Sequence, residues 1–401
     1  MTTGQPPLLR RLNEGAVLEA LRKHGPLSRA ALARRLHLSK STITEIVADL
    51  LRRGIVQEVA RERPGPAGRT ATLLDIAPNA GSVCGVDIGG TLVRAAAADL
   101  KGRVLARLAE EVSHAGLLAL EEQVVSLVQR VSAQAGVRSV PLLAAGVGVP
   151  GAVAPETGIV TLCPNLPFLE GVALAPRLEE ALGCQVLVEN DVNLGAIGEK
   201  WRGCATSVPN FAYMAIGTGV GMGIVLNGDL YRGARGFAGE VGYMPVPTKQ
   251  GPQALEEVIG GEAIARRYVE RLQTPECRPT VTARHVFDAA RKGDPLAMAV
   301  VDDVVQAMAW AIASVTATLD LSLVVIGGGV AGQNADLLLE PVSKRLAALV
   351  PFVPEIRLSS LGGDANLYGA IAVALRHGHL RLESEETAFV QARRDADADG
   401  R

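Results

Sequence analysis

Val86-Asp87-Ile88-Gly89-Gly90-Thr91 ends an apolar segment, Val83 to Ile88, with two glycines and a threonine. Glycines after a buried strand let backbone N–H groups approach phosphate oxygens, because no Cβ stands in the way. Asp87 could orient a metal-bound water, and Thr91 could donate to a phosphate. The segment is neither a Walker loop nor a GxGxxG that opens a helix, since a second strand is predicted from Thr91 to Asp99. A plain hairpin turn is the alternative for this segment taken alone.

Two more glycine loops follow apolar strands much later in the chain. Gly217-Thr218-Gly219-Val220-Gly221-Met222-Gly223 follows Phe211 to Ile216, and Gly327-Gly328-Gly329 follows Val324-Val325-Ile326. Two loops around the phosphates and a third beside the adenosine is the pattern of the actin/hexokinase superfamily. The predicted nucleotide-phosphate residues are Asp87, Gly89, Gly90, Thr91, Gly217, Thr218, Gly219, Gly328 and Gly329.

Glu189-Asn190-Asp191-Val192-Asn193 joins a predicted strand to a predicted helix. A carboxylate at a strand end, next to an amide, suits removal of a proton from a sugar hydroxyl. Asn190 can both donate to and accept from vicinal hydroxyls. The alternative is that Asp191 only caps the following helix.

The first 77 residues have a different pattern. Helical stripes are predicted from Leu8 to His24, from Ser28 to His37 and after Ser39, and Ser28 and Ser39 are good N-caps. Two alternating strands then flank the basic turn Arg61 to Arg69. Helix, helix, helix and hairpin predict a winged helix-turn-helix.

The second helix of such a motif enters the major groove, and the wing meets phosphates or the minor groove. Residues 1–80 hold 13 Lys/Arg and 7 Asp/Glu, whereas the whole chain has a net charge of −2. A basic head on an acidic body suits DNA binding; a solvated basic face is the alternative for any single arginine. The predicted DNA-binding residues are Ser39, Lys40, Ser41, Thr42, Thr44, Glu45, Arg61, Arg63 and Arg69.

Composition limits the class of protein. The chain has 401 residues, 48% of them hydrophobic and 20% charged, which is typical of a globular protein with two or three domains. No transmembrane stretch or signal peptide is predicted, so a cytoplasmic location with no membrane partner is expected. The five cysteines form no CxxC pair and predict neither disulfides nor a zinc site.

From about Ser82 to Gly378 the chain resembles the ROK family of repressors and sugar kinases, and residues 8–77 resemble the winged helix of its regulators. The segments that carry this resemblance are Asp87–Thr91, Gly148-Val149-Pro150-Gly151, Pro164-Asn165-Leu166, Glu189–Asn193, Gly217–Gly223, Gly236 to Gly242 and Ile326–Val330. The resemblance implies an α/β fold: a winged helix, then a two-lobed actin/hexokinase-like body. It also implies Asp191 as a catalytic base and a sugar site at Asn190, Asp191, Glu240, Glu256, Asn165 and Gly151.

The expected domains follow from these patterns. They are residues 1–77 for the winged helix, 78–81 for a linker, 82–198 for the first lobe with a helix at about 366–380, 199–365 for the second lobe, and 383–401 for a flexible tail.

The chain departs from the family where a Glu-x-Gly-His is expected, because it has Glu240-Val241-Gly242-Tyr243. That histidine normally binds a structural zinc, and the cysteine segment that should follow is absent, so no metal is expected. Tyr243 can bind sugar or simply pack. The leading hypothesis is a sugar-responsive regulator of carbohydrate genes, expected to be a repressor, that needs no cofactor. Its expected partners are operator DNA, a sugar or sugar phosphate, and further copies in a homodimer or homotetramer. The alternative is an ATP- and Mg-dependent sugar kinase with a DNA-binding head.

Overall fold

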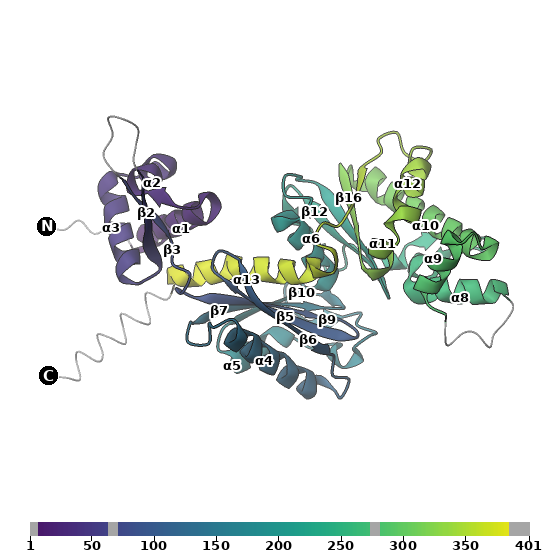
Figure 1. Cartoon of the computed structure of the whole chain (residues 1–401), viewed down its shortest axis with the longest axis horizontal. Helices are drawn as coiled ribbons and strands as arrows, with labels where there is room; N and C mark the ends of the chain where they lie inside the picture. Colours follow the sequence, from purple (N-terminus) through teal and green to yellow (C-terminus); the bar gives the residue numbers. More distant parts are fainter. Residues whose placement is uncertain (1–6, 63–70, 273–280, 385–401) are drawn as a thin grey trace.

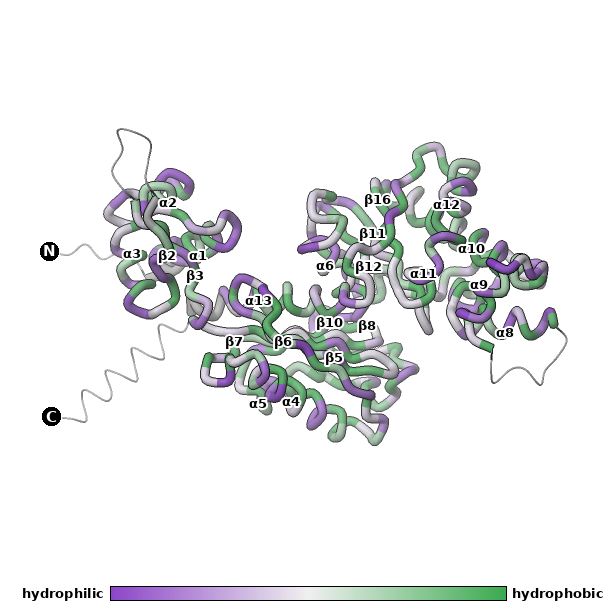
Figure 2. Tube along the Cα trace, in the orientation of Figure 1, coloured by the Kyte–Doolittle hydropathy of each residue, from purple (hydrophilic) through white to green (hydrophobic). Residues whose placement is uncertain are grey.

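The computed structural model describes residues 7–62, 71–272 and 281–384. Figure 1 shows a small N-terminal domain at one end of the molecule and two larger lobes beside it. Apolar residues fill the strands and inner helix faces of each lobe (Figure 2). This arrangement confirms the predicted α/β fold with a winged helix and a two-lobed body.

The N-terminal domain is a winged helix. Ser28 caps α2 by accepting from the N–H of Ala31, and Ser39 caps α3 by accepting from the N–H of Thr42, as predicted. A short strand that the sequence analysis did not name, β1, pairs with β3. The predicted basic residues Arg63 and Arg69 lie outside the described residues. The elements are α1 (Pro7–His24), β1 (Leu27–Ser28), α2 (Arg29–Leu36), α3 (Lys40–Arg52), β2 (Val56–Glu62) and β3 (Ala71–Ile76).

Two almost fully buried acids, Glu14 and Asp49, tie the predicted DNA-reading helix to α1. Arg53 reaches both, with Nη1 3.2 Å from Glu14 Oε2 and 3.4 Å from Asp49 Oδ2. Arg10 Nε lies 3.1 Å from Glu14 Oε1. Buried carboxylates need such partners. These contacts therefore hold α3 against α1 within the head.

Lobe I is built on a five-stranded sheet of order β10-β7-β4-β5-β6. The pairs β4–β7 and β7–β10 are parallel, whereas β4, β5 and β6 form antiparallel hairpins. Helices α4 and α5 cover one face, and α13 covers the other (Figure 1). The elements are β4 (Ser82–Ile88), β5 (Leu92–Asp99), β6 (Val104–Glu111), α4 (Leu117–Gln134), β7 (Leu142–Val149), β8 (Ala152–Val153), β9 (Val160–Thr161), η1 (Pro167–Leu169), α5 (Leu174–Leu182), β10 (Gln185–Asn190), α6 (Asp191–Arg202) and α13 (Ala365–Ser384).

Lobe II repeats the plan with a sheet of order β13-β12-β11-β16-β17. Its helix α10 is long and apolar enough to cross a membrane, but most of it is buried in the core of this lobe. The elements are β11 (Phe211–Ile216), β12 (Val220–Leu226), β13 (Asp229–Leu230), η2 (Val241–Tyr243), β14 (Pro245–Val246), β15 (Gln253–Ala254), α7 (Glu256–Ile259), α8 (Gly261–Leu272), α9 (Ala283–Arg291), α10 (Pro295–Leu319), β16 (Leu323–Gly327), α11 (Gly329–Gln333), α12 (Ala335–Leu346), β17 (Glu355–Leu358) and η4 (Gly362–Asp364).

Helices α6 and α13 cross closely between the lobes, and glycines make this approach feasible. A Cβ on Gly369 would lie 1.8 Å from the carbonyl oxygen of Leu194, and one on Gly198 would lie 2.2 Å from that of Ala365. Any larger residue would push the helices apart. The two helices therefore behave as one rigid pair.

The winged helix packs against lobe I as well as being joined to it by residues 78–81. One apolar cluster contains Leu18 and Ile76 of the head together with Leu100 of lobe I and Leu375 of α13. Figure 1 shows one end of α13 under the head and the other between the lobes. Helix α13 also continues through Ser384, so the tail predicted from residue 383 is helical at its start. Residues 385–401 lie outside the described part of the chain.

Candidate sugar site, nucleotide cavity and DNA-binding surface

The segment Glu189 to Asn193 turns from β10 into α6, and Asn190, not Asp191, is the N-cap. Asn190 Oδ1 accepts from the N–H of Asn193 (3.0 Å), and Asn190 Nδ2 donates to the carbonyl oxygen of Gly151 (3.1 Å). One amide hydrogen of Asn190 is left for a ligand. The structure thus places three of the predicted sugar residues, Gly151, Asn190 and Asp191, together at the end of strand β10.

Asp191 lies in the first turn of α6, next to the first glycine loop. A Cβ on Gly148 would lie 3.5 Å from Asp87 Oδ1 and 3.6 Å from the Cα of Asp191. Removal from water, then the nearby Asp87 and Glu240 carboxylates, raise the pKa of Asp191 to about 7. A carboxyl group with a pKa near 7 suits proton transfer at neutral pH.

The first glycine loop is the hairpin turn between β4 and β5, and its predicted role in phosphate binding stays a prediction. Asp87 and Arg94 face each other across β4 and β5, and Arg94 Nε donates to Asp87 Oδ2 (3.0 Å). Gly90 meets Asn165, since a Cβ there would lie 3.4 Å from Asn165 Cβ. The exposed Thr91 and Gly89 complete the turn. Arg94 is a partner of Asp87 that the sequence analysis did not name.

Lobe II contributes two neighbouring acids, Glu240 and Glu256. Burial and the charge of Glu256 raise the pKa of Glu240. Glu256 Oε2 accepts from the N–H of Val220 (2.8 Å), and a Cβ on Gly219 would lie 2.9 Å from the same oxygen. These contacts join Glu256 to the second glycine loop.

Tyr243 ends the short η2 helix that begins after Glu240, and its side chain is 58% exposed. Its ring contacts Phe237, with ring centroids 5.8 Å apart. Among the described residues no group of three or more His, Cys, Asp or Glu side chains could hold a metal ion. Tyr243 and the short strand Pro245–Val246 after it do not fit the zinc of the family motif.

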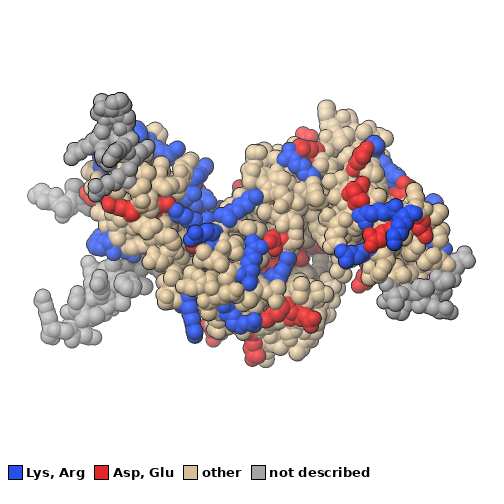
Figure 3. Space-filling model, viewed as in Figure 1, with Lys and Arg blue, Asp and Glu red and all other residues tan. Residues whose placement is uncertain are grey.

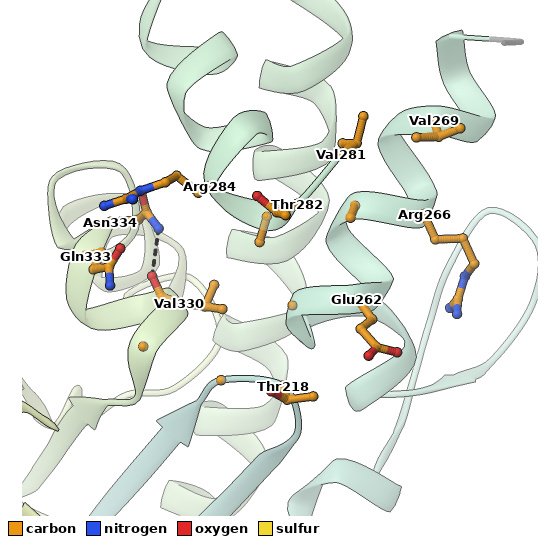
Figure 4. Close-up of a pocket in the computed structure, with 15 residues that line it drawn as sticks. Thr218, Glu262, Arg266, Val269, Val281, Thr282, Arg284, Val330, Gln333 and Asn334 are labelled. Carbon is orange, nitrogen blue, oxygen red and sulfur yellow. Dashed lines mark hydrogen bonds between the residues drawn. The ribbon is translucent and has the colours of Figure 1, made fainter. Parts of the chain in front are cut away.

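A cavity of about 510 Å³ lies between the second and third glycine loops. This volume suits a small organic ligand. Gly217, Thr218 and Gly329 line it as predicted, whereas Gly328 has φ +85° and packs on the backbone of Ile216. Figure 4 shows polar side chains from three helices around the cavity, with Asn334 Nδ2 donating to the carbonyl oxygen of Val330 (2.7 Å). The lining polar residues that the sequence analysis missed are Glu262, Arg266, Thr282, Arg284, Gln333 and Asn334.

The predicted DNA-reading residues at the start of α3 lie on its outer face. Lys40 and Glu45 are exposed, and Thr44 Oγ1 donates to the carbonyl oxygen of Lys40 (2.7 Å). Ser39 Oγ contacts the hydroxyls of Ser41 and Thr42, each at 2.8 Å. Arg61 lies in β2, and its side chain lies outside the described part of the structure.

Two exposed arginines near this face, Arg34 and Arg35, end helix α2 and were missed by the sequence analysis. Basic residues near the predicted recognition helix provide phosphate contacts. The sequence contained a signal for both arginines, because they lie in α2 at positions outside its apolar stripe. Figure 3 shows more Lys and Arg than Asp and Glu on the visible face of the head.

A winged helix joined to a two-lobed body with three glycine loops and paired acids defines a DNA-binding protein with a body like that of sugar kinases. The ROK family model matches residues 83–377, and a MarR family model matches residues 10–69. This chain belongs to the ROK family.

Similar proteins include regulators and kinases. A putative xylose repressor of Caldicellulosiruptor sp. is 26% identical over 93% of this chain and 97% of its own length. A glucokinase of Halalkalibacterium halodurans is 32% identical over 71% of this chain and 92% of its own. The solved structure of a ROK family transcriptional regulator, a homolog of E. coli MLC protein, has a TM-score of 0.78 and 24% identity, covering 94% and 98% of the two chains.

Proposed function

We propose that this protein is a sugar-responsive DNA-binding repressor of carbohydrate genes, with the sugar bound between Asp191 of lobe I and Glu240 and Glu256 of lobe II. One observation carries the proposal: α13 runs from the proposed sugar site to the DNA-binding head, and α6 runs from that site to Lys101, which pairs with Asp75 of the head. Xylose repressors that align with almost the whole chain support it.

Helix α6 begins with Asp191, and near its other end Arg202 Nη2 donates to the carbonyl oxygen of Lys101 (3.1 Å). Lys101 in turn pairs with Asp75 of the winged helix. A ligand that displaces the first turn of α6 would therefore move a helix whose end contacts Lys101, the residue that pairs with the head.

Helix α13 connects the same two regions. Asn366 in its first turn lies with Nδ2 3.4 Å from Asp87 Oδ1. Near its other end, His379 Nε2 lies 3.0 Å from the carbonyl oxygen of Leu100, beside α1. Because the ligand shifts DNA affinity only by its differential affinity for two arrangements, DNA must shift sugar affinity by the same factor.

The test uses the full chain, D-xylose and D-glucose as probes, and DNA from upstream of its own gene. Titration of each sugar with and without saturating DNA should give dissociation constants that differ by roughly 5–150-fold for the effector. Asp191→Asn should weaken sugar binding by about 1.5–3 kcal/mol. Equal constants for every sugar with and without DNA contradict a sensor function.

A second candidate function is that of an ATP- and Mg-dependent sugar kinase. The pKa of Asp191 near 7 and the retained cavity favour it. Thr218 and the backbone at Gly217 and Gly329 would hold the nucleotide, which supplies the transferable phosphoryl group; Asp191 would accept the proton from the sugar hydroxyl. Arg94 on Asp87 argues against metal binding at that acid. A coupled ATP-consumption assay with the same sugars decides between the two functions.

The regulator is proposed to act in the cytoplasm as a homodimer or homotetramer. Helix-turn-helix proteins read paired half-sites about one helical turn apart, roughly 34–36 Å, which needs two heads. Light scattering of the free protein and of its DNA complex measures the number of copies; a monomer bound to a single half-site contradicts this.

A further inference from the structure

Exposed aromatic side chains gather in one short part of lobe II. Among the described residues, the aromatic side chains classed as exposed are Tyr231, Phe237, Tyr243 and Phe352. Three of the four lie within the segment 231–243, on either side of Glu240. Apolar groups gathered at a surface mark a place where something binds.

Two of these rings, Phe237 and Tyr243, form a pair that is fixed to the proposed sugar site. Their centroids are 5.8 Å apart and their planes meet at 42°, so the pair is tilted rather than stacked flat. The N–H of Glu240 donates to the carbonyl oxygen of Phe237, and the N–H of Tyr243 donates to that of Glu240, both at 3.2 Å. These backbone hydrogen bonds fix both ring-bearing residues to the backbone of Glu240.

The same segment crosses the boundary between the lobes. Arg232 Nε lies 2.6 Å from Glu189 Oε2 of lobe I. Gly236 has φ +77°, and a Cβ there would lie 2.1 Å from the carbonyl oxygen of Val153 in β8. Phe237 directly follows this contact, so its exposed ring lies close to the boundary between the lobes.

We propose that Phe237 and Tyr243 form a platform for a second saccharide ring, so that the effector is a disaccharide or a longer glycoside. This rests on the proposed function, in which one ring lies between Asp191 and Glu240. A substituent on the Glu240 end of that ring leaves the cleft over the aromatic pair. A pyranose has an apolar C–H face that packs on aromatic rings, and its hydroxyls reach water and the Tyr243 hydroxyl.

Calorimetric titration of the full chain with matched probes tests the proposal: D-xylose against xylobiose, and D-glucose against maltose and cellobiose. At least one disaccharide should bind roughly tenfold more tightly than its monosaccharide. Phe237→Ala should remove most of that advantage while changing monosaccharide affinity by less than about twofold, because one aromatic contact accounts for it. Phe352→Ala, at an exposed aromatic elsewhere in lobe II, is the control and should change neither affinity.

Equal or weaker binding of every disaccharide, with monosaccharide binding intact, overturns the platform and leaves the proposed function standing. The same loss for both probes in Phe237→Ala also overturns it. If Phe237→Ala turns a dimer into monomers with unchanged affinities, the rings belong to a contact between copies and the proposal is wrong. Failure of every probe to bind overturns the proposed function together with the platform.

Discussion

Lys101 in the turn between β5 and β6 forms an ion pair with Asp75, the buried acid near the end of the last strand of the winged helix. The carbonyl oxygen of Lys101 also accepts from Arg202 at the end of α6. One residue thus contacts the DNA-binding head and the helix that begins at Asp191. The β5–β6 turn therefore connects the winged helix to the helix that begins at the proposed sugar site.

Replacing Lys101 with alanine should weaken the contact between the winged helix and lobe I. Within the described residues Asp75 would keep the N–H of Ile76 as its donor, and an under-satisfied buried charge costs about 1–3 kcal/mol. Urea denaturation followed by far-UV circular dichroism measures the loss. Lys344→Ala is the matched control, because Lys344 pairs with Glu340 in solvent and such pairs are worth about 0–1 kcal/mol. Equal losses of unfolding free energy in the two variants would show that the Lys101–Asp75 pair stabilises the protein no more than an exposed ion pair does.

DNA binding should divide between phosphate and base contacts. Arg34→Ala or Arg35→Ala should weaken specific and random DNA alike and lower the salt slope by about one unit each, because a phosphate contact releases counterions. Lys40→Ala should instead change the preference among operator sequences. Fluorescence anisotropy at several salt concentrations measures both. Arg345→Ala in lobe II is the control, and a uniform loss for all three head variants contradicts the division.

Much of this fold is predictable because long periodic segments carry their own signal. Strand β11 has the predicted bounds, and α1 and β4 each begin one residue before the predicted start, since apolar period and flanking turns agree there. Strand β17 and helix α12 were not named. β17 has only Glu355–Leu358, and α12 holds a proline, Pro341, within its length.

The candidate site was partly accessible from the sequence. The strand-then-glycine pattern located three loops, and Asp191 follows its strand directly. The Arg94–Asp87 pair needs the register of β4 and β5, and a hairpin register depends on the turn geometry. The cavity side chains Arg266, Arg284 and Asn334 come from separate elements and share no motif, so only the packing of lobe II brings them together.

Asp191 should make stability depend on pH. Its pKa is about 7 in the folded chain and about 3.9 when unfolded. The folded state therefore holds a proton that the unfolded state releases, and this stabilisation is full below about pH 3.9 and lost as pH rises through 7. Asp191→Asn should therefore stabilise the protein by about 1.5 kcal/mol at pH 5 and by at most about 4 kcal/mol at pH 8.

Urea denaturation at both pH values tests this expectation. Asp229→Asn, at an exposed aspartate of β13, is the control and should behave alike at pH 5 and pH 8. A stability difference between wild type and Asp191→Asn that is independent of pH would mean that the carboxyl group titrates near its ordinary value.

Metal analysis of the purified protein should find no tightly held zinc, because Tyr243 and its neighbours cannot replace the thiolate and imidazole ligands that zinc prefers. Inductively coupled plasma mass spectrometry after dialysis against a chelator measures the content. One zinc per chain would show that residues far from the family motif hold the metal.

Glu199 should control how the lobes rotate, because this fully buried acid joins the two chain segments that pass between them. Its Oε2 accepts from the N–H of Cys204 (2.9 Å) in the first crossing. Its Oε1 accepts from the Ser359 hydroxyl and from the N–H of Leu361 (3.2 Å) in the second. A carboxylate, which only accepts, fits this site, since the two N–H groups and the hydroxyl all donate to it.

Glu199→Gln puts an amide N–H₂ among these donors and should destabilise the chain by about 1–3 kcal/mol. With the hinge loosened, sugar binding should no longer select one arrangement of the lobes. Operator DNA should then change the sugar dissociation constant by less than about twofold, against roughly 5–150-fold in the wild type. Glu180→Gln, at an exposed glutamate of α5, is the control. If Glu199→Gln is destabilised but keeps the wild-type coupling, the two crossings do not form the hinge that carries the sugar signal.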